Sequence, residues 1–122
     1  TAAEIKKEGI KKVGLLGTKF TMELDFFTSK LKDYQIESII PEAVDREFIQ
    51  ETIYFELGKG IVKEETKQRY LSIIDKLIDK GARGIILGCT EIPLLIKPED
   101  VSVSTFDTAK IHCEAAVDFS LN

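Results

Sequence analysis

The sequence predicts an α/β fold with three layers, in which a four-stranded parallel sheet carries helices on both faces. Short apolar runs alternate with longer amphipathic stretches, which is the pattern of strands alternating with helices. Helical segments separate these runs, and such crossovers join parallel strands with a right-handed connection. The 122 residues form one domain, residues 1–122, since domains commonly hold about 100–150 residues.

Apolar spacing and turn residues define the elements of the first half of the chain. Residues 2–8 form a helix, and the apolar run 11–17 forms the first strand. A helix over about 22–31 follows. The alternating segment 36–40 forms a second, shorter strand that ends at Pro41.

The second half begins with two helices, over residues 42–57 and 64–80, which a glycine-rich break around Lys59 separates. A strand over 84–87 and a fourth strand over 101–106 complete the sheet, and the last helix runs from Asp107 or Thr108 to about Leu121. The helix residues expected to face inward are Met22, Phe26, Phe27, Leu31, Phe48, Ile49, Ile53, Leu57, Tyr70, Ile73, Ile74, Leu77 and Ile78.

The segment GARGIILGCTEIPLLI, residues 81–96, predicts a buried strand, a tight turn and the start of a helix. Cys89 follows the strand directly, at the end of the sheet where open α/β folds place their ligands. Thr90 is positioned to cap the short helix, Glu91 falls in its first turn, and Pro93 is tolerated there.

Cys89 has two interpretations. The positive end of a helix dipole favours the thiolate, which is the reactive form of cysteine. The alternative is a small side chain packed in the core, since free cysteine is among the most buried residue types. The position at a strand end, the adjacent Gly88 and the polar neighbours Thr90 and Glu91 favour a reactive thiol.

Composition excludes several classes of protein. The net charge is −4 and there is no basic cluster, which argues against a nucleic-acid partner. No apolar run is long enough to span a bilayer and no signal peptide opens the chain, so we expect a cytoplasmic protein without a membrane partner. Two cysteines and one histidine fit neither a disulfide framework nor a metal-ligand spacing. Because the chain starts at Thr1, we expect a piece of something longer or a processed product.

Other polar residues also fall at strand ends. Thr18 and Thr21, with free backbone N–H groups, would form a pocket for a carboxylate or phosphate, or would simply cap a helix. The nucleotide-binding glycine motifs are absent from this segment. Lys59 flanks the glycine break, within reach of a substrate carboxylate. His112 is read as a packed or capped histidine, with a proton-transfer role as the alternative, and Cys113 as a core residue.

Four blocks of the sequence resemble the C-terminal half of the aspartate/glutamate racemase family, the cofactor-independent amino-acid racemases. They are VGLLGTKFTMELDFF (13–27), IPEAVDRE (40–47), GARGIILGCTEIPLLI (81–96) and FDTAKIHCEAAVDF (106–119). The GCTE block is the most specific, because it resembles the second catalytic cysteine motif of the family.

The resemblance implies a reaction with two cysteines on opposite sides of the substrate α-carbon, without pyridoxal phosphate or a metal. One cysteine removes the α-proton as a thiolate, and the other returns a proton as a thiol. By position Cys89 is one of the two. Thr18, Thr21, Thr90 and Glu91 are then expected to belong to the substrate site, although no role follows for Glu91 or for His112.

The resemblance also implies that a first half is missing, with its own cysteine and substrate contacts. Lys59 matches a substrate-binding lysine of some family members. We expect the 122 residues alone to be inactive on aspartate or glutamate, and an uncovered apolar surface to favour a homodimer. Two alternatives are a single-cysteine relative, such as a decarboxylase whose thiol protonates a carbanion after loss of CO2, and a small-molecule-binding domain without turnover.

Overall fold

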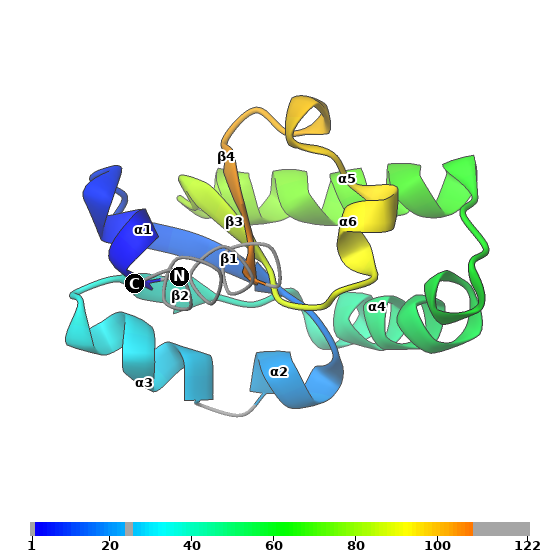
Figure 1. The fold of residues 1–122 in the computed structure, drawn as a ribbon, viewed down its shortest axis with the longest axis horizontal. Helices are drawn as coiled ribbons and strands as arrows, with labels where there is room; N and C mark the ends of the chain where they lie inside the picture. Colours follow the sequence, from blue (N-terminus) through cyan, green and yellow to red (C-terminus); the bar gives the residue numbers. More distant parts are fainter. Residues whose placement is uncertain (1, 24–25, 109–122) are drawn as a thin grey trace, which may run out of the picture.

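A computed structural model describes residues 2–23 and 26–108 of the chain (Figure 1). The elements are the helices α1 (Ala2–Lys7), α2 (Lys19–Glu23), α3 (Phe26–Asp33), α4 (Ala43–Phe55), α5 (Glu64–Asp79) and α6 (Ile92–Leu95), the short 3₁₀ helices η1 (Leu57–Lys59) and η2 (Pro98–Asp100), and the strands β1 (Lys12–Leu16), β2 (Glu37–Ile39), β3 (Gly84–Leu87) and β4 (Ser104–Asp107). The helix expected up to Leu121, with His112 and Cys113, lies outside the described residues.

The four strands form one sheet in the order β2-β1-β3-β4. All three neighbouring pairs are parallel, and Leu16 at the end of β1 pairs with Leu87 at the end of β3. This register aligns the carboxyl ends of the two central strands. The predicted fold class, a four-stranded parallel sheet in an α/β domain, is confirmed.

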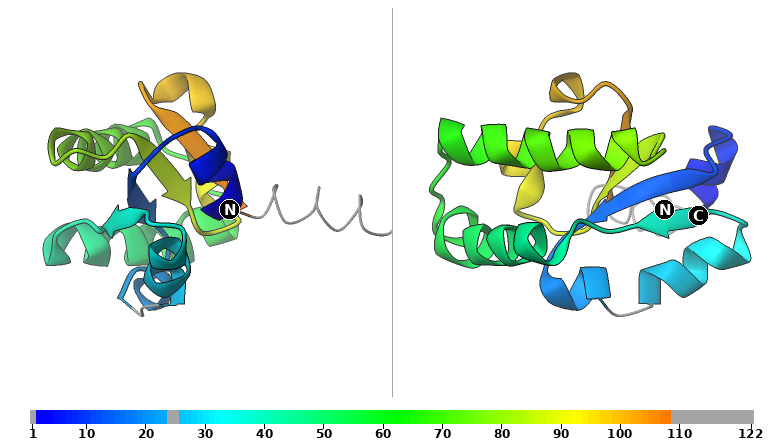
Figure 2. Two further views of the ribbon diagram at one scale, coloured as in Figure 1. Left: turned by 90° about the vertical axis from the view of Figure 1, so that its left-hand side faces the viewer. Right: turned by 180° about the vertical axis from the view of Figure 1, so that it is seen from behind.

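Helices pack on both faces of the sheet. Leu16, Ile85 and Leu87 point into a core that α4, α5 and α6 cover. Val13, Leu15 and Ile86 point to the opposite face, where Ile5 of α1 and Leu31 of α3 complete a second core. The left view of Figure 2 shows α4 and α5 to one side of the strands and α1 to the other. The three-layer arrangement follows from strands that are buried on both faces.

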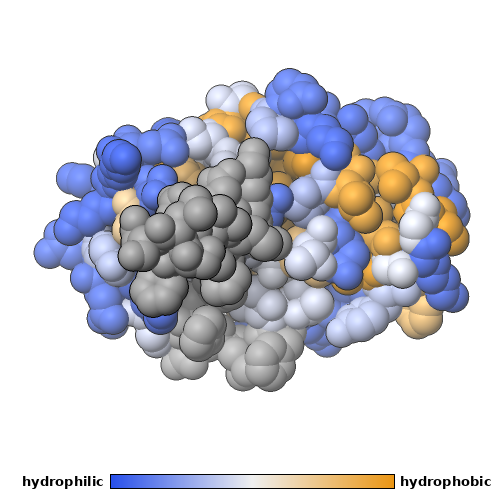
Figure 3. All heavy atoms as spheres, viewed as in Figure 1, coloured by the Kyte–Doolittle hydropathy of each residue, from blue (hydrophilic) through white to orange (hydrophobic). Residues whose placement is uncertain are grey.

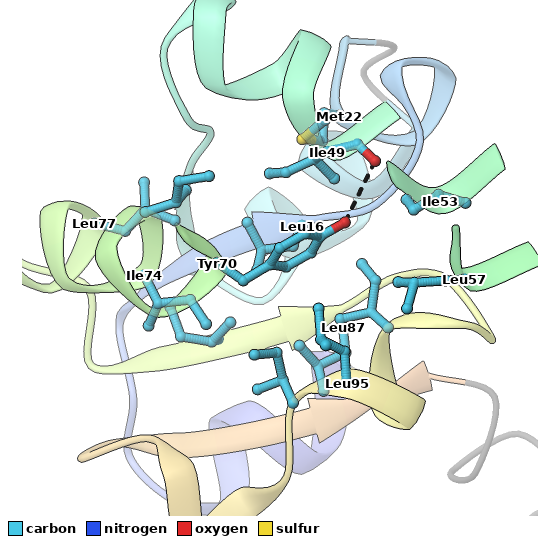
Figure 4. Close-up of a cluster of buried hydrophobic side chains, with 14 of the residues drawn as sticks. Leu16, Met22, Ile49, Ile53, Leu57, Tyr70, Ile74, Leu77, Leu87 and Leu95 are labelled. Carbon is cyan, nitrogen blue, oxygen red and sulfur yellow. Dashed lines mark hydrogen bonds between the residues drawn. The ribbon is translucent and has the colours of Figure 1, made fainter. Parts of the chain in front are cut away.

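Tyr70 is the largest fully buried side chain of the first core. Figure 4 shows its ring among Leu16, Ile74 and Leu87, with the phenol donating to the carbonyl oxygen of Ile49 at 3.3 Å. The same phenol lies 2.7 Å from the Thr52 hydroxyl, so a buried polar end is satisfied inside an apolar layer.

Several predicted elements have different bounds in the structure, and three of them differ for a clear reason. The described parts of the helix predicted over 22–31 belong to α2 and α3, and α2 starts before the predicted bound because the Thr21 N–H donates to Thr18 Oγ1 at the first turn. The strand predicted over 101–106 is shorter, because β3 begins at Gly84, which pairs with Ser104. The loop predicted over 97–100 forms the 3₁₀ helix η2.

The longest helix in the described part of the chain is α5, with 16 residues. No helix among residues 2–23 and 26–108 is both long and apolar enough to cross a membrane.

Candidate functional site

The candidate site lies where β1 and β3 end side by side. The N–H of Gly88 donates to the carbonyl oxygen of Leu16 at 2.7 Å, which holds the two chain segments together beyond the last ladder pair. A Cβ on Gly88 would lie 2.9 Å from that oxygen and 3.1 Å from Thr21 Cγ2, and a Cβ on Gly17 would lie 3.0 Å from the same Thr21 atom. The two glycines therefore leave the room in which Thr21 lies against the Cys89 segment.

The turn from Thr18 to Thr21 uses its own amide groups. Thr21 N–H donates to Thr18 Oγ1 at 3.3 Å, and the N–H of Lys19 donates to Gln50 Oε1 on α4 at 2.7 Å. The expected anion pocket with free N–H groups is therefore wrong at Lys19 and Thr21, because both groups have partners within the protein. The two threonine hydroxyls lie 3.1 Å apart and remain the polar feature that this turn offers.

A polar cluster held by hydrogen bonds forms from the side chains of Cys89, Thr90 and Glu91. The Cys89 thiol donates to Glu91 Oε2 at 2.6 Å, and the Thr90 hydroxyl donates to the same oxygen at 2.9 Å. Thr90 is therefore not the predicted helix cap: α6 starts at Ile92, its N-cap residue is Glu91 with no side-chain cap, and Pro93 lies in its first turn. Cys89 is partly buried and packs against the core that contains Tyr70.

Cys89 is a thiol rather than a thiolate at neutral pH. Burial, followed by the hydrogen bond to Glu91, raises the pKa of Cys89 to about 11. The backbone N–H groups of Glu91 and Ile92 at the start of α6 do lower the pKa of Cys89, as predicted for a helix N-terminus, but burial and the carboxylate beside the sulfur outweigh them. The hydrogen bond from Cys89, with that from Thr90, lowers the pKa of Glu91, so the cluster holds one negative charge on the carboxylate.

Tyr70 approaches the site from the core side. Burial raises the pKa of its phenol well above the usual value and outweighs the hydrogen bond with Thr52, which lowers it, so the group is neutral. From its spacing, Tyr70 was predicted only as part of the inward stripe of its helix. The signal in the sequence is a tyrosine on a helix face otherwise made of isoleucine and leucine. Its buried hydroxyl requires a hydrogen-bond partner within the core.

Lys59 lies on η1, which contacts α6, the helix that follows the cysteine cluster. Its side chain is exposed on η1, and its ammonium lies 5.8 Å from the centroid of the Phe55 ring. Within residues 2–23 and 26–108, no hydrogen bond or ion pair joins Lys59 to Thr18, Thr21 or Cys89. The structure thus brings together the threonine turn and the cysteine cluster, and among the described residues Lys59 has no direct bond to either.

A cavity of about 430 Å³ lies on the β4 side of the same sheet edge. Its lining comes from α1, the end of β3 at Leu87, β4 and the α6–η2 segment, and it includes Asp107 but not Cys89. Among the described residues, no group of three or more histidine, cysteine or acidic side chains is placed to hold a metal ion.

Comparison with known proteins identifies the family. The model of the Asp/Glu/Hydantoin racemase family matches residues 1–116. The chain belongs to this racemase family. Its cysteine cluster therefore lies in the kind of domain on which these racemases are built, and the resemblance of the four sequence blocks is confirmed at the level of the family.

Solved structures of racemase relatives share the fold. A crystal structure assigned as an Asp/Glu racemase from Yersinia pestis superposes with a TM-score of 0.94 at 47% identity, over 100% of this chain and 54% of its own. An aspartate racemase homologue from Pyrococcus horikoshii OT3 gives 0.91 at 40% identity, over 99% and 53%. The aspartate racemase of Picrophilus torridus gives 0.64 at 28% identity, over 87% and 43%. The chain spans about half the length of these relatives.

Proposed function

We propose that the chain supplies one half of the active site of a racemase that interconverts the L and D forms of an acidic amino acid, aspartate before glutamate. The observation that carries the proposal is the Cys89 thiol at the shared carboxyl edge of β1 and β3, in a domain of the racemase family. A thiol in this place can exchange a proton with the α-carbon of a substrate bound at the sheet edge.

The reaction makes a strong demand on the site. The α-proton of an amino acid is very weakly acidic, so the negative charge that develops on its removal has to be stabilised by hydrogen-bond donors shielded from water. The Thr90 hydroxyl shares a Glu91 oxygen with Cys89, and Thr18 and Thr21 lie on the turn that meets the Gly88–Cys89 segment. We assign them to the substrate carboxylate and amine, with Lys59 as an outer contact, and we assign no metal or organic cofactor.

The proposed partner is a second α/β half with the other cysteine. The surface next to the site is suited to such a partner, because Phe55, Ile61, Val62 and Leu94 are exposed by 65%, 40%, 54% and 52%. Figure 3 shows apolar atoms gathered at the right of the molecule, over α6 and the neighbouring segment that joins α4 to α5. We call these four residues the apolar patch. A homodimer through this patch is the alternative partner.

The test measures proton exchange and inversion at the α-carbon of L- and D-aspartate in D2O by NMR. The chain is assayed alone and together with the half of the Yersinia pestis relative that it does not match. The half that it does match is 47% identical to it. We expect inversion only when both halves are present. Cys89→Ala should abolish it, and Cys113→Ser serves as the matched control that keeps activity.

Two outcomes would contradict the proposal. Inversion that continues in Cys89→Ala would remove this thiol from the reaction. Absence of inversion with both halves, when a mixing assay shows that they bind each other, would remove the racemase assignment. Exchange by the chain alone that depends on Cys89 would show that a half site, or a homodimer of it, is sufficient for proton abstraction.

The protonated state of Cys89 also fits a second function. A single thiol that protonates a carbanion after loss of CO2 requires a sulfur that holds its proton, and the hydrogen bond to Glu91 provides one. The substrates that separate the two functions are aryl- and alkylmalonates. A racemase leaves them unchanged, whereas a decarboxylase of this type releases CO2 from them.

A further inference from the structure

The polar cluster of Cys89, Thr90 and Glu91 has a geometry that the proposed function does not explain by itself. Two donors of consecutive residues converge on one oxygen, since both Sγ of Cys89 and Oγ1 of Thr90 bind Glu91 Oε2. A carboxylate that only bound substrate would have its oxygens available for that ligand. This carboxylate instead directs one oxygen to the sulfur of its own chain.

We propose that Glu91 is a positioning residue that keeps the proton on the Cys89 sulfur in the free site, so that Cys89 enters the reaction as the proton donor and acts as the base only in the reverse direction. The inference rests on the proposed function for the identity of the acceptor. The thiol gives its proton to the α-carbanion: a C–H bond forms at the α-carbon, the S–H bond breaks, and its electron pair stays on sulfur as a thiolate. The carbanion arises when a second base, of the thiolate class, removes the α-proton from the opposite face.

The charges around Cys89 favour the thiol, which is the proton-donating form, in the free site. Among the described residues, the titratable groups that interact with the sulfur are Glu91 on its own segment and Tyr70 on α5. Tyr70 is neutral, because burial raises the pKa of its phenol. Glu91 is ionised, so a thiolate at Cys89 would lie beside a negative charge, whereas the thiol makes a hydrogen bond to it.

Two other polar features of the molecule, the ion pairs of Asp45 and the cavity beside β4, do not support a proposal about chemistry. The ion pairs of Asp45 with Arg69 and Lys76 join α4 to α5 and have a structural explanation. The cavity beside β4 contains no polar side chain that is buried and unpaired among the described residues. The Cys89–Glu91 pair is the feature with a chemical consequence.

The test measures the alkylation of Cys89 by iodoacetamide as a function of pH, in a Cys113→Ser background that leaves one cysteine. The inflection of the rate gives the pKa of the thiol, and the measurement needs neither substrate nor a second half. We expect Glu91→Gln to lower the inflection by about one unit, because the neighbouring charge is removed. The gain in rate at pH 8 is then about threefold, since a less basic thiolate is also a weaker nucleophile.

Two variants serve as controls. Glu99→Gln removes the same charge from the exposed helix η2 and should leave the inflection unchanged. Thr90→Val keeps the carboxylate and removes its second donor, so the inflection should stay at or above the wild-type value. An inflection that does not move in Glu91→Gln, or that falls as much in Thr90→Val, overturns the proposal.

A second measurement covers the case in which Glu91→Gln does not fold. Because the Cys89 S–H is the leading cause of the low pKa of Glu91, Cys89→Ala should raise the pKa of that carboxyl, as read by NMR titration of its ¹³C-labelled side chain. An unchanged Glu91 titration would overturn the proposal. Failure of the racemisation assay alone would instead reject the proposed function, while the two titrations still decide the pairing of Cys89 with Glu91.

Discussion

The hydroxyl groups of Thr52 on α4 and Tyr70 on α5 lie 2.7 Å apart inside the core against which Cys89 packs. Thr52 Oγ1 also donates to the carbonyl oxygens of Phe48 and Ile49, at 2.9 and 3.0 Å. The helices that support the site are thus joined by a buried polar contact as well as by apolar packing. Burial makes such a contact costly to break from one side only.

We expect Thr52→Val to destabilise the domain by about 1–2 kcal/mol, because the Tyr70 phenol keeps only its longer bond to Ile49. Urea denaturation followed by circular dichroism measures the change. In Thr52→Val/Tyr70→Phe both partners are removed, so the double variant should cost less than the sum of the single ones. Additive costs would show that the two hydroxyls do not interact.

Gly88→Ala should disturb the edge where β1 and β3 meet. The added methyl group would lie 2.9 Å from the Leu16 carbonyl oxygen, a backbone atom, and 3.1 Å from Thr21 Cγ2. We expect a loss of about 1–3 kcal/mol and a changed alkylation rate of Cys89, since the contact forces the backbone to move. Thr21→Ser in the same background removes one of the two contacts and should recover part of the stability. A Gly88→Ala protein as stable as the wild type would contradict this packing.

The ion pairs of Asp45 predict that the domain loses stability in acid. Burial opposes ionisation of this carboxyl, but the hydrogen bonds and charges of Arg69 and Lys76 outweigh it and lower its pKa below 3.8. Since the folded state has the lower pKa, the stabilisation is complete above the unfolded value and is lost as the pH falls through the folded one. Stability from this group therefore decreases from about pH 5 downward.

The variant Asp45→Asn isolates the contribution of the Asp45 carboxylate to the free energy of unfolding. We expect it to cost about 2 kcal/mol at pH 7, below the usual range for a buried pair because both cations are about half exposed. The difference between variant and wild type should narrow as the pH approaches 3. Denaturation midpoints at pH 7 and pH 3 measure it, and Asp75→Asn on the exposed side of α5 is the matched control. A difference that is the same at both pH values would contradict the ion pairs.

The strands and the place of Cys89 were predictable because they follow from local pattern. Gly84–Leu87 is an apolar run with β-branched residues, and its bounds as β3 are those predicted. The hydrogen-bond partners and the charges of the site could not be predicted from local pattern. The amide of Lys19 binds Gln50, which is 31 residues away, and the charge next to Cys89 depends on the conformation of the Glu91 side chain. Spacing places residues at an edge, but it does not say which polar groups are already paired.

The apolar patch predicts where a second half binds. Phe55 and Leu94 are exposed by 65% and 52%, at the end of α4 and on α6, and covering such side chains contributes about 1.5–3 kcal/mol each. We therefore expect Phe55→Gln/Leu94→Gln to weaken binding to the other half of the Yersinia pestis relative by at least about tenfold, as measured by isothermal titration calorimetry.

Val44→Gln is the control for this variant. Val44 is exposed by 72% but lies at the first turn of α4, at the opposite end of that helix from Phe55. It should leave the affinity unchanged. Equal weakening by both variants would show that exposed apolar area in general, rather than the surface beside the Cys89 site, drives the association. Unchanged affinity in the double variant, with weaker self-association in sedimentation, would assign the patch to a homodimer.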